Sequence, residues 1–426
     1  MLTDAAEETK QKLLVLLGSR RDDQGIFNYA RKSKTLTALM ANKISLQKAL
    51  DADLPYETDI YQQESVWELC SRLYKKFNLK FHSCNEYSVP LAAIASEKYG
   101  HESGVCLTGA KACRDKLWQR RILAKHGLSN IRFHSVTSPE DLKRTDKKIP
   151  LPCIVKPVDD AGSRGVIYCK THKEVLKAVQ NIANMATTYT GQLRAPEILI
   201  EEFINGQEFS IEACTQNRNT SLIAITQKTN SGPPFFIETG HFQPARLPEK
   251  WQEKIRDLII SSHKALSINN VVTHTEIKMS DEQAEIVEIN GRPGGDFIPD
   301  LTRLTVGTDL LELGAHIALD GTTENFRGIT PKYSYASIRF LLAPYKGTIH
   351  YREAFDTDDG YILASQFYPS PGETVKKTTD NFSRLGYVLA AGNSSVIVQK
   401  ATDKFLNASG YMIRKPQKEW KGCNNA

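Results

Sequence analysis

The sequence predicts a protein of mixed α/β and α+β class with more than one domain, on three observations. The chain has 426 residues, and this length suggests two or three domains, since one domain usually holds about 150 residues. Charged residues make up 24% and hydrophobic residues 40% of the chain, as in compact, water-soluble proteins. Short apolar runs alternate with helical patterns first, and longer strand-like runs follow, so we expect a parallel α/β layer and then a strand-rich region.

The alternating elements come first in the chain. Gly18 and Ser19 follow the first apolar run and resemble the start of a dinucleotide-binding turn. A complete GxGxxG is absent, so a tight turn between a strand and a helix is the preferred interpretation. The expected elements are strands over 13–17 and 79–82 and helices over 64–76 and 89–99.

A different pattern begins at Lys111. We expect a charged helix over 111–126, then strand, helix, strand, glycine loop, strand and helix, and finally long strands that end at Asn290. Beyond Pro331, two β-rich runs and a helical run predict a small α/β lid. These runs are residues 333–342, 361–367 and 395–406.

The charge, the hydropathy and the cysteine pattern limit which partners and which cellular compartment we expect. The net charge of +6 is small for this length and is not gathered in one stripe, so nucleic-acid binding is not supported, whereas nucleotides are compatible partners. No apolar run reaches 18 residues and the segment 1–12 is acidic and polar, so we expect no membrane span, no signal peptide and a cytoplasmic location. The eight cysteines form no CxxC pair and predict reduced thiols, with a zinc site or a disulfide framework as the alternative.

A lysine and a glycine-rich loop form the first candidate site. An apolar strand ends at Lys156, and the loop after it contains Gly162, Ser163 and Gly165. Backbone N–H groups of such a loop can approach a phosphate while the ammonium supplies full charge. The Walker pattern GxxxxGK[ST] is absent, and an ordinary surface turn is the alternative.

Acidic residues flank an Asn-Gly turn in the segment 197–212. Glu201 lies at the end of one apolar strand and Glu208 opens the next. Strand alternation places Glu208, Ser210 and Glu212 on one face. A carboxylate beside a hinge can bind ribose hydroxyls while backbone groups bind adenine; a solvated sheet face is the alternative.

Two alternating runs around residues 281–283 form the most specific pattern. A hairpin that pairs position 280 with 284 also places Glu276 opposite Glu288. Directly paired side chains have Cβ atoms about 5 Å apart, and like charges there need a neutralising partner. With Asn290 on the same face, Mg²⁺ is the cation that fits. The opposite face should be core: Thr275, Ile277, Met279, Val287 and Ile289.

Two further patches flank this hairpin. Arg292 lies in an abrupt RPGG turn and could supply charge to a developing anion beside the metal; a solvated acidic face would not explain that turn. Glu238 and His241 lie near aromatic residues, where Glu238 could neutralise a substrate ammonium. A structural or solvated histidine is the alternative for His241.

In this order, the segments resemble the ATP-grasp superfamily. FIETGHFQPARL (236–247) and VEINGRPGGDFIPDL (287–301) resemble its L-amino-acid ligase branch, which includes dipeptide and carnosine-type synthases. The specific motifs span roughly 112–320. The resemblance implies a Rossmann-like pre-grasp domain over 1–110, an ATP-grasp domain over 111–325 with subdomains of about 111–205 and 206–325, and a C-terminal α/β lid over 326–426.

The resemblance also implies roles for individual residues. Arg292 and Lys156 would be catalytic, with Arg292 holding the acyl-phosphate and the substrate carboxylate. Magnesium, with manganese as an alternative, would be held by Glu276, Glu288 and Asn290. ATP would be bound by Lys116, Lys156, Gly162, Ser163, Gly165, Glu201, Phe203, Ile204 and Glu208, and the first amino acid by Glu238, His241, Arg292 and Gly295.

The reaction implied is an ATP-dependent ligation of a carboxylate and an amine. The carboxylate of an amino acid takes the γ-phosphate of ATP, and an amine or a second amino acid attacks the acyl-phosphate, giving ADP and phosphate. The alternatives are an ATP-grasp ligase with another acceptor, biotin-carboxylase-like or purine-biosynthetic, and a non-catalytic nucleotide-binding module. The family also implies a homodimer.

Overall fold

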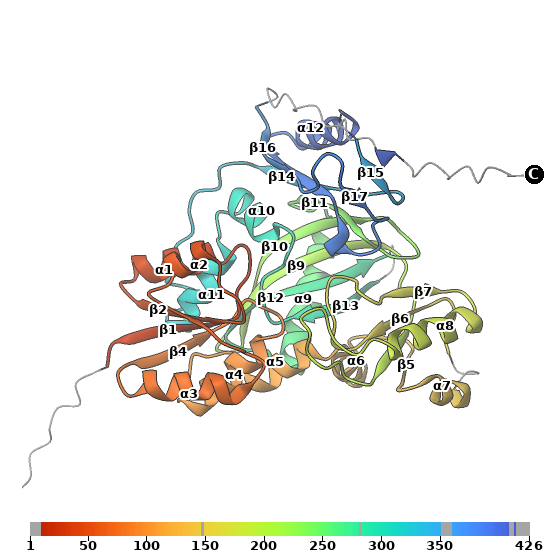
Figure 1. The fold of residues 1–426 in the computed structure, drawn as a ribbon. Helices are drawn as coiled ribbons and strands as arrows, with labels where there is room; N and C mark the ends of the chain where they lie inside the picture. Colours follow the sequence, from red (N-terminus) through yellow and green to blue (C-terminus); the bar gives the residue numbers. More distant parts are fainter. Residues whose placement is uncertain (1–9, 146–148, 281–282, 351–359, 409–412, 415–426) are drawn as a thin grey trace, which may run out of the picture.

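The computed structural model describes residues 10–145, 149–280, 283–350, 360–408 and 413–414. The polar segment 1–9 and the turn residues 281 and 282, both part of the predictions above, lie outside the described residues. Within the described residues the strands form four sheets, and no helix there is long and apolar enough to cross a membrane. Figure 1 shows the N-terminal part in red and orange beside a central green sheet, with the C-terminal part in blue.

The N-terminal sheet is parallel, with the strand order β3-β2-β1-β4. Side chains of β1 alternate between two cores, with Leu13 and Val15 in one and Leu14 and Leu16 in the other. Burial on both faces explains why this strand is a continuous apolar run. The elements are β1 (Lys12–Leu17), α1 (Gln24–Lys32), β2 (Leu36–Ala41), α2 (Leu46–Asp51), β3 (Leu54–Glu57), α3 (Gln63–Tyr74), β4 (Asn78–His82), α4 (Val89–Lys98) and, from later in the chain, α11 (Leu310–Ala318).

The charged helix predicted over 111–126 is wrong, because two helices cover this region. They are α5 (Leu107–Arg114) and α6 (Lys116–Lys125). Asp115 between them has an extended backbone (φ −107°, ψ 103°), and its carboxylate accepts hydrogen bonds from the backbone N–H groups of Leu117 and Trp118. An aspartate that caps the orphan N–H groups starts a new helix, and this places Lys116 at the first turn of α6.

The second sheet is antiparallel, with the order β5-β8-β6-β7. Its strands and helices are β5 (Phe133–Val136), α7 (Pro139–Thr145), β6 (Cys153–Pro157), β7 (Ile167–Cys169), α8 (His172–Ala183) and β8 (Ile198–Glu202). Val175, Val179 and Ile182 of α8 pack against one face in a core of their own. Helix α8 starts with a capping box formed by Thr171 and Glu174.

The central sheet has eight strands in the order β13-β12-β9-β10-β11-β14-β18-β16. Helices α5, α6 and α9 contact its β9, β10, β12 and β13 end, where the largest core lies. Strands from the predicted lid continue the same sheet, because β11 pairs with β14. The strands are β9 (Gln207–Gln216), β10 (Asn219–Asn230), β11 (Glu238–Gln243), β12 (Val271–Met279), β13 (Ala284–Asn290), β14 (Tyr335–Leu341), β16 (Ile362–Phe367) and β18 (Gly386–Gly392), with helices α9 (Glu249–Ala265), α10 (Ile298–Thr305) and α12 (Ser395–Ala408).

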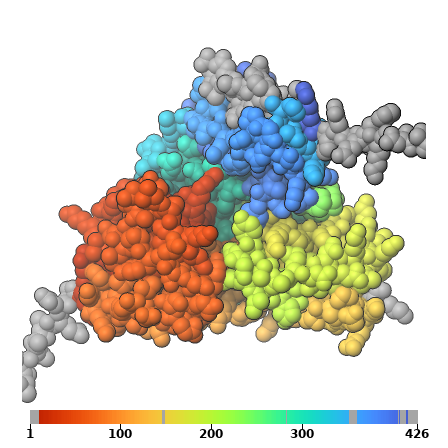
Figure 2. Space-filling model, viewed as in Figure 1, coloured from red at the N-terminus to blue at the C-terminus, as the bar shows by residue number. Residues whose placement is uncertain are grey.

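A small three-stranded sheet completes the C-terminal part. It consists of β15 (Gly347–Ile349), β17 (Thr374–Val375) and β19 (Ile413–Arg414), and a short 3₁₀ helix, η2 (Asn381–Ser383), precedes β18. Figure 2 shows the red, yellow-green and blue parts of the surface meeting around a hollow. The predicted domain limits stay predictions. The residues that face the hollow are those at which the three parts of the chain meet.

Candidate active site

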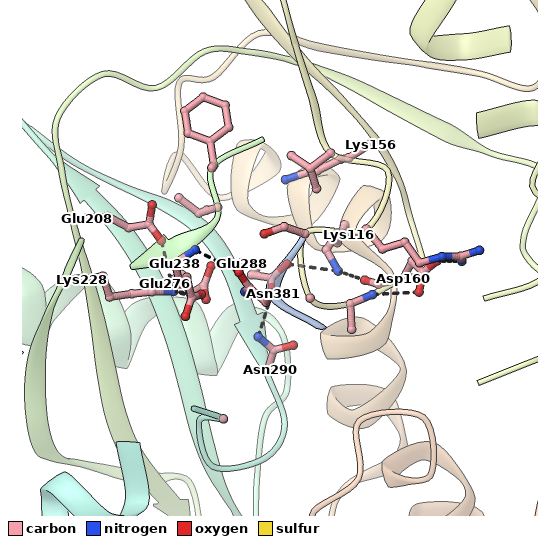
Figure 3. A pocket seen from close by; sticks show the side chains of 18 of the residues that line it. Lys116, Lys156, Asp160, Glu208, Lys228, Glu238, Glu276, Glu288, Asn290 and Asn381 are labelled. Carbon is pink, nitrogen blue, oxygen red and sulfur yellow. Dashed lines mark hydrogen bonds and ion pairs between the residues drawn. The ribbon is translucent and has the colours of Figure 1, made fainter. Parts of the chain in front are cut away.

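One cavity of about 330 Å³ collects most of the residues singled out above. Its walls come from the connection between β4 and α4, helix α6, the second sheet, the central sheet and η2. Figure 3 shows part of this wall, with acidic residues of the central sheet facing Lys116 and Lys156. The predicted residues that line it are Lys116, Lys156, Gly162, Ser163, Glu201, Phe203, Ile204, Glu208, Glu238, Glu276, Glu288, Asn290, Arg292 and Gly295.

The paired carboxylates lie on β12 and β13 as predicted. Glu276 is directly opposite Glu288, which confirms the register at this pair. Nearer the turn the pairing is offset by one position, since Met279 pairs with Ala284 and not with Glu285, and a β-bulge between Glu276 and Ile277 restores the predicted register at the acidic pair. The bulge also turns Val287 into the cavity wall, so its assignment to the core is wrong.

The donor set on these strands fits a hard divalent cation. The side-chain N–H of Asn290 donates to Glu288 Oε1 at 3.0 Å, which leaves the amide oxygen of Asn290 available as a ligand. Two carboxylates and an amide oxygen on one face are ligands that Mg²⁺ prefers. Lys116 Nζ lies 3.1 Å from Glu288 Oε2 and donates to the backbone oxygen of Asp160 at 2.9 Å, so the acidic pair and a cation meet at one point.

Lys228 lies at the centre of the acidic wall, and sequence reasoning missed it. This β10 lysine is 1% exposed, and its Nζ lies 3.1 Å from Glu208, 2.9 Å from Glu238 and 2.5 Å from Glu276. Burial alone would lower the pKa of Lys228, but the three carboxylates raise it well above its usual value. No local motif marks Lys228, since only the strand order β12-β9-β10-β11 brings these groups together.

Lys156 is held in place by a buried ion pair. Glu201 contacts both Lys156 and Arg120, with 3.0 Å between Arg120 Nε and Glu201 Oε2. Burial would raise the pKa of Glu201, but the two cations hold it below its usual range. The side chain of Glu201 therefore orients Lys156, and both residues line the cavity.

The glycine loop contributes two of its three predicted residues to the wall. Gly162 and Ser163 line the cavity with positive φ of 65° and 60°. Gly165 does not line it, which corrects the prediction: a Cβ at this position would approach Pro157 and Met185 instead. Its positive φ of 75° gives Gly165 a conformational role in turning the chain back into β7.

Arg292 lies at the junction with the N-terminal part of the chain, at the connection between β4 and α4. Its guanidinium contacts Glu86, a residue that sequence reasoning missed. Burial would raise the pKa of Glu86, but Arg292, Lys116 and Arg114 lower it to about 2. Both Arg292 and Glu86 line the cavity, so a cation is fixed beside the acidic pair of β12 and β13.

Glu238 lines the cavity, but His241 does not. His241 is 1% exposed and lies behind Glu238, with 3.1 Å between its Nε2 and Glu238 Oε2. Alternation along β11 and pairing with β14 direct this ring against Phe340. The prediction that His241 lines the amino-acid pocket is therefore wrong, and its contact with that pocket is through Glu238. Burial would raise the pKa of Glu238, but Lys228 and His241 hold it well below its usual range.

One end of the cavity is aromatic. Phe203 and Ile204 follow β8, and Phe236 lies opposite them, with 5.7 Å between the two phenyl centroids. Lys278 Nζ lies 4.7 Å from the centroid of Phe203, and burial lowers the pKa of Lys278. Flat apolar surface with one cation beside it is a suitable surface for a planar heterocycle.

The third group of missed residues comes from the C-terminal part. Asn381, Phe382 and Arg384 line the cavity, and Arg384 contacts Asp296. The backbone N–H of Glu238 donates to Asn381 Oδ1 at 3.0 Å. A short NFSR stretch carries no chemical motif, so its place in the wall depends on the fold alone.

The comparisons agree with this geometry. The ATP-grasp domain profile matches residues 149–300. The chain is 28% identical over 251 residues to an alanine–anticapsin ligase of Bacillus subtilis (54% of this chain, 51% of the ligase) and 26% identical over 297 residues to an uncharacterised protein, y4rH, of Sinorhizobium fredii (68% and 60%). The chain thus spans between half and two thirds of these curated relatives.

Solved structures extend the likeness to the whole fold. The L-amino acid ligase of Bacillus licheniformis superposes with a TM-score of 0.78 at 19% identity, covering 96% of this chain and 100% of that one. Phosphoribosylglycinamide synthetase of Anaerococcus prevotii superposes with a TM-score of 0.69 at 19% identity, covering 95% and 100%.

Residues 149–300 thus form an ATP-grasp domain. The chain contains this domain and has the fold of solved ATP-grasp structures, which confirms the predicted resemblance to the ATP-grasp superfamily and the predicted fold class. Within that superfamily it resembles the L-amino acid ligase of Bacillus licheniformis in structure and alanine–anticapsin ligase in sequence. ATP-grasp enzymes generally use ATP with Mg²⁺, and the acidic face of β12 and β13 is where the donors for such an ion lie.

Proposed function

We propose that this protein is an ATP-dependent ligase that joins an amino acid to an amine or a second amino acid through an acyl-phosphate. One observation carries the proposal: Lys116, Lys156 and Arg292 border the same cavity as the paired Glu276 and Glu288. Phosphoryl transfer from ATP places negative charge where these cations and a metal would meet. The relatives named above support an amino-acid substrate.

ATP would lie across the cavity from the aromatic end to the acidic pair. The adenine fits beside Phe203 and Ile204, and the ribose hydroxyls fit Glu208, which lines the same wall. Lys156 and the backbone at Gly162 and Ser163 would hold the phosphates. When bound, Mg²⁺ on Glu276, Glu288 and Asn290 neutralises charge on the transferred phosphoryl group.

In the first step, an oxygen of the substrate carboxylate attacks the γ-phosphorus, and the bond from that phosphorus to the β–γ bridging oxygen breaks to release ADP. Arg292, fixed by Glu86, stabilises the acyl-phosphate that forms. In the second step, the nitrogen of the unprotonated amine attacks the acyl carbon. The acyl C–O bond breaks, and phosphate leaves with the proton that the nitrogen loses.

Glu238 would bind the ammonium group of an amino acid. Its pKa is held well below the usual range by Lys228 and His241, so this carboxylate stays ionised and is a poor proton acceptor. An ionised carboxylate on the cavity wall is suited to holding a cation in place. Gly295 lines the same cavity, and a Cβ added there would meet nothing within 4 Å.

A pooled amino-acid mixture with Mg²⁺ and ATP tests the proposal by mass spectrometry of the products. We expect a dipeptide or an amide with one ADP and one phosphate per product, and loss of product with Glu288→Gln. The exposed Glu253→Gln on α9 is the matched control and should keep activity. ADP release that needs bicarbonate, or ATP binding without turnover on any amine, would contradict an amino-acid ligase.

The same resemblance supports a cytoplasmic homodimer. Sedimentation equilibrium on the full chain would test the oligomeric state, with a mass of about one chain (47.7 kDa) contradicting the dimer.

A further inference from the structure

The 3₁₀ helix η2 of the C-terminal part reaches the glycine loop of the second sheet. The ring of Phe382 stacks on the ring of Tyr189, with 3.9 Å between centroids and 3° between planes. Tyr189 lies in the connection between α8 and β8, far from Phe382 in the sequence. Two segments without strand pairing between them are therefore joined by one aromatic contact.

Phe382 also rests on the glycine loop itself. A Cβ added at Gly162 would lie 2.3 Å from Cε2 of Phe382, so the ring occupies the space that any side chain at 162 would need. The backbone N–H of Asn381 donates to the carbonyl oxygen of Gly162 at 3.5 Å, a long hydrogen bond. The ring is thus held between Gly162 and Tyr189, and Gly162 and Phe382 both line the cavity.

Tyr189 is tied to the start of the same loop. Its backbone N–H donates to Asp160 Oδ1 at 3.1 Å, and Asp160 Oδ1 also accepts from the hydroxyl of Tyr87 at 2.9 Å. Asp160 is 3% exposed, so these bonds are shielded from water. Arg164, four residues on, contacts the other oxygen of Asp160 and donates to Thr187 O at 2.9 Å. The loop is therefore anchored at Asp160 and covered at Gly162 by Phe382.

We propose that Phe382 and Tyr189 are positioning residues that hold the glycine loop closed over the phosphates of ATP. The inference rests on the proposed ligase function, because closure matters most where water would hydrolyse an acyl-phosphate. Neither ring carries a group that reacts. Their effect is on the geometry of the loop and on the access of water to the site.

The contact is suited to opening and closing. Phe382 is 49% exposed and Tyr189 is 55% exposed although they stack, so each ring buries only part of its surface. Aromatic pairs of this kind shift an equilibrium by about two- to tenfold. Such a contact favours the closed loop without preventing the release of ADP.

Hydrogen–deuterium exchange of the loop amides over 160–166 tests the proposal without needing turnover. We expect Phe382→Leu and Tyr189→Leu to speed this exchange by about two- to tenfold, and Phe382→Trp, which keeps a flat ring, to restore it. The double variant should match the single ones, since each already breaks the same contact. Leu193→Ala, 87% exposed in the same connection as Tyr189, is the matched control and should leave exchange unchanged.

The catalytic readout is the ratio of phosphate released to amide product. It should exceed one in Phe382→Leu and Tyr189→Leu, with a raised KM for ATP, and return to one in Phe382→Trp. The control for folding is amide exchange in strands β1–β4, which should be the same in every variant as in the wild type. Unchanged loop exchange in both leucine variants would overturn the positioning role. If loop exchange changes but no substrate pair gives product, the ligase function fails and the positioning role stands.

Discussion

The carboxylate of Glu201 is the group whose removal most directly tests the electrostatics of the site. Its side chain is 3% exposed and lies between Arg120, 2% exposed, and Lys156, 5% exposed. Replacing Glu201 with glutamine keeps the shape and one hydrogen-bonding oxygen but leaves two cations without a counter-charge. We expect the second sheet to lose stability and Lys156 to lose its fixed position.

The magnitude follows from the two contacts. A hydrogen bond to a charged group contributes about 1.5–3 kcal/mol, and removing one partner of a buried ion pair costs about 3–5 kcal/mol. We therefore expect Glu201→Gln to lower the local free energy of opening by about 3–5 kcal/mol at pH 7.

The pH dependence has a definite sign. The pKa of Glu201 is lower in the folded protein than in the unfolded chain, so its contribution is fully present above a pH of about 4.3 and is lost as pH falls through the folded value. The difference between the wild type and Glu201→Gln should therefore be constant from pH 7 to about pH 5 and then narrow on further acidification.

Hydrogen exchange of β6 and β8 amides measures this opening energy element by element, which suits a chain of several parts. The neighbouring Glu202→Gln is the control, because Glu202 pairs with Arg132 at the surface, with side chains 34% and 66% exposed, and should cost at most about 1 kcal/mol. Equal costs for the two variants, or a cost for Glu201→Gln below about 1 kcal/mol at pH 7, would refute the reasoning.

Three further predictions concern the central sheet and residues next to it. Gly206→Ala should destabilise the protein by at least about 1 kcal/mol, because φ is +126° there and a Cβ would lie 2.1 Å from the carbonyl oxygen of Met279; an unchanged urea midpoint would contradict this. Burial lowers the pKa of His263 to about 3, so the free energy of unfolding of the wild type should fall by about 1.4 kcal/mol per pH unit below about pH 6.5 because of this residue. In His263→Gln the decrease of stability with acid should be less steep. Parallel curves of stability against pH for the two proteins would exclude the effect. Glu276→Gln should raise the Mg²⁺ concentration needed for half-maximal ADP release by about tenfold or more. The same Mg²⁺ dependence as in the wild type would show that Glu276 is not a metal ligand.

Short-range patterns predicted much of the fold and part of the site. The run at 13–17 is a buried parallel strand, β1, and the acidic pair lies in its predicted register. Both follow from period-two alternation, which depends on neighbouring residues only. The single helix over 111–126 was wrong because Asp115 ends one helix and caps another, a choice between two helical paths that hydropathy does not distinguish.

The bulge in the β12–β13 hairpin shows the limit of pattern reasoning. A bulge changes the face of one side chain without changing the sequence pattern around it. The pattern therefore predicts Val287 as a core residue, but Val287 lines the cavity. It predicts His241 as a cavity residue, but His241 packs against Phe340. In both cases the backbone path and the neighbouring strand determine the direction of the side chain.

The sequence by itself predicted the resemblance to the ATP-grasp superfamily, the order of most elements and the residues with obvious chemistry, such as Lys156, Glu288 and Arg292. Each belongs to a local pattern in which residue type and spacing suffice. The tertiary structure alone decided that Lys228 neutralises three carboxylates and that Phe382 covers the glycine loop. The physical reason is that these contacts join segments far apart in the chain, so strand order and the meeting of three parts create them, and no local motif records them.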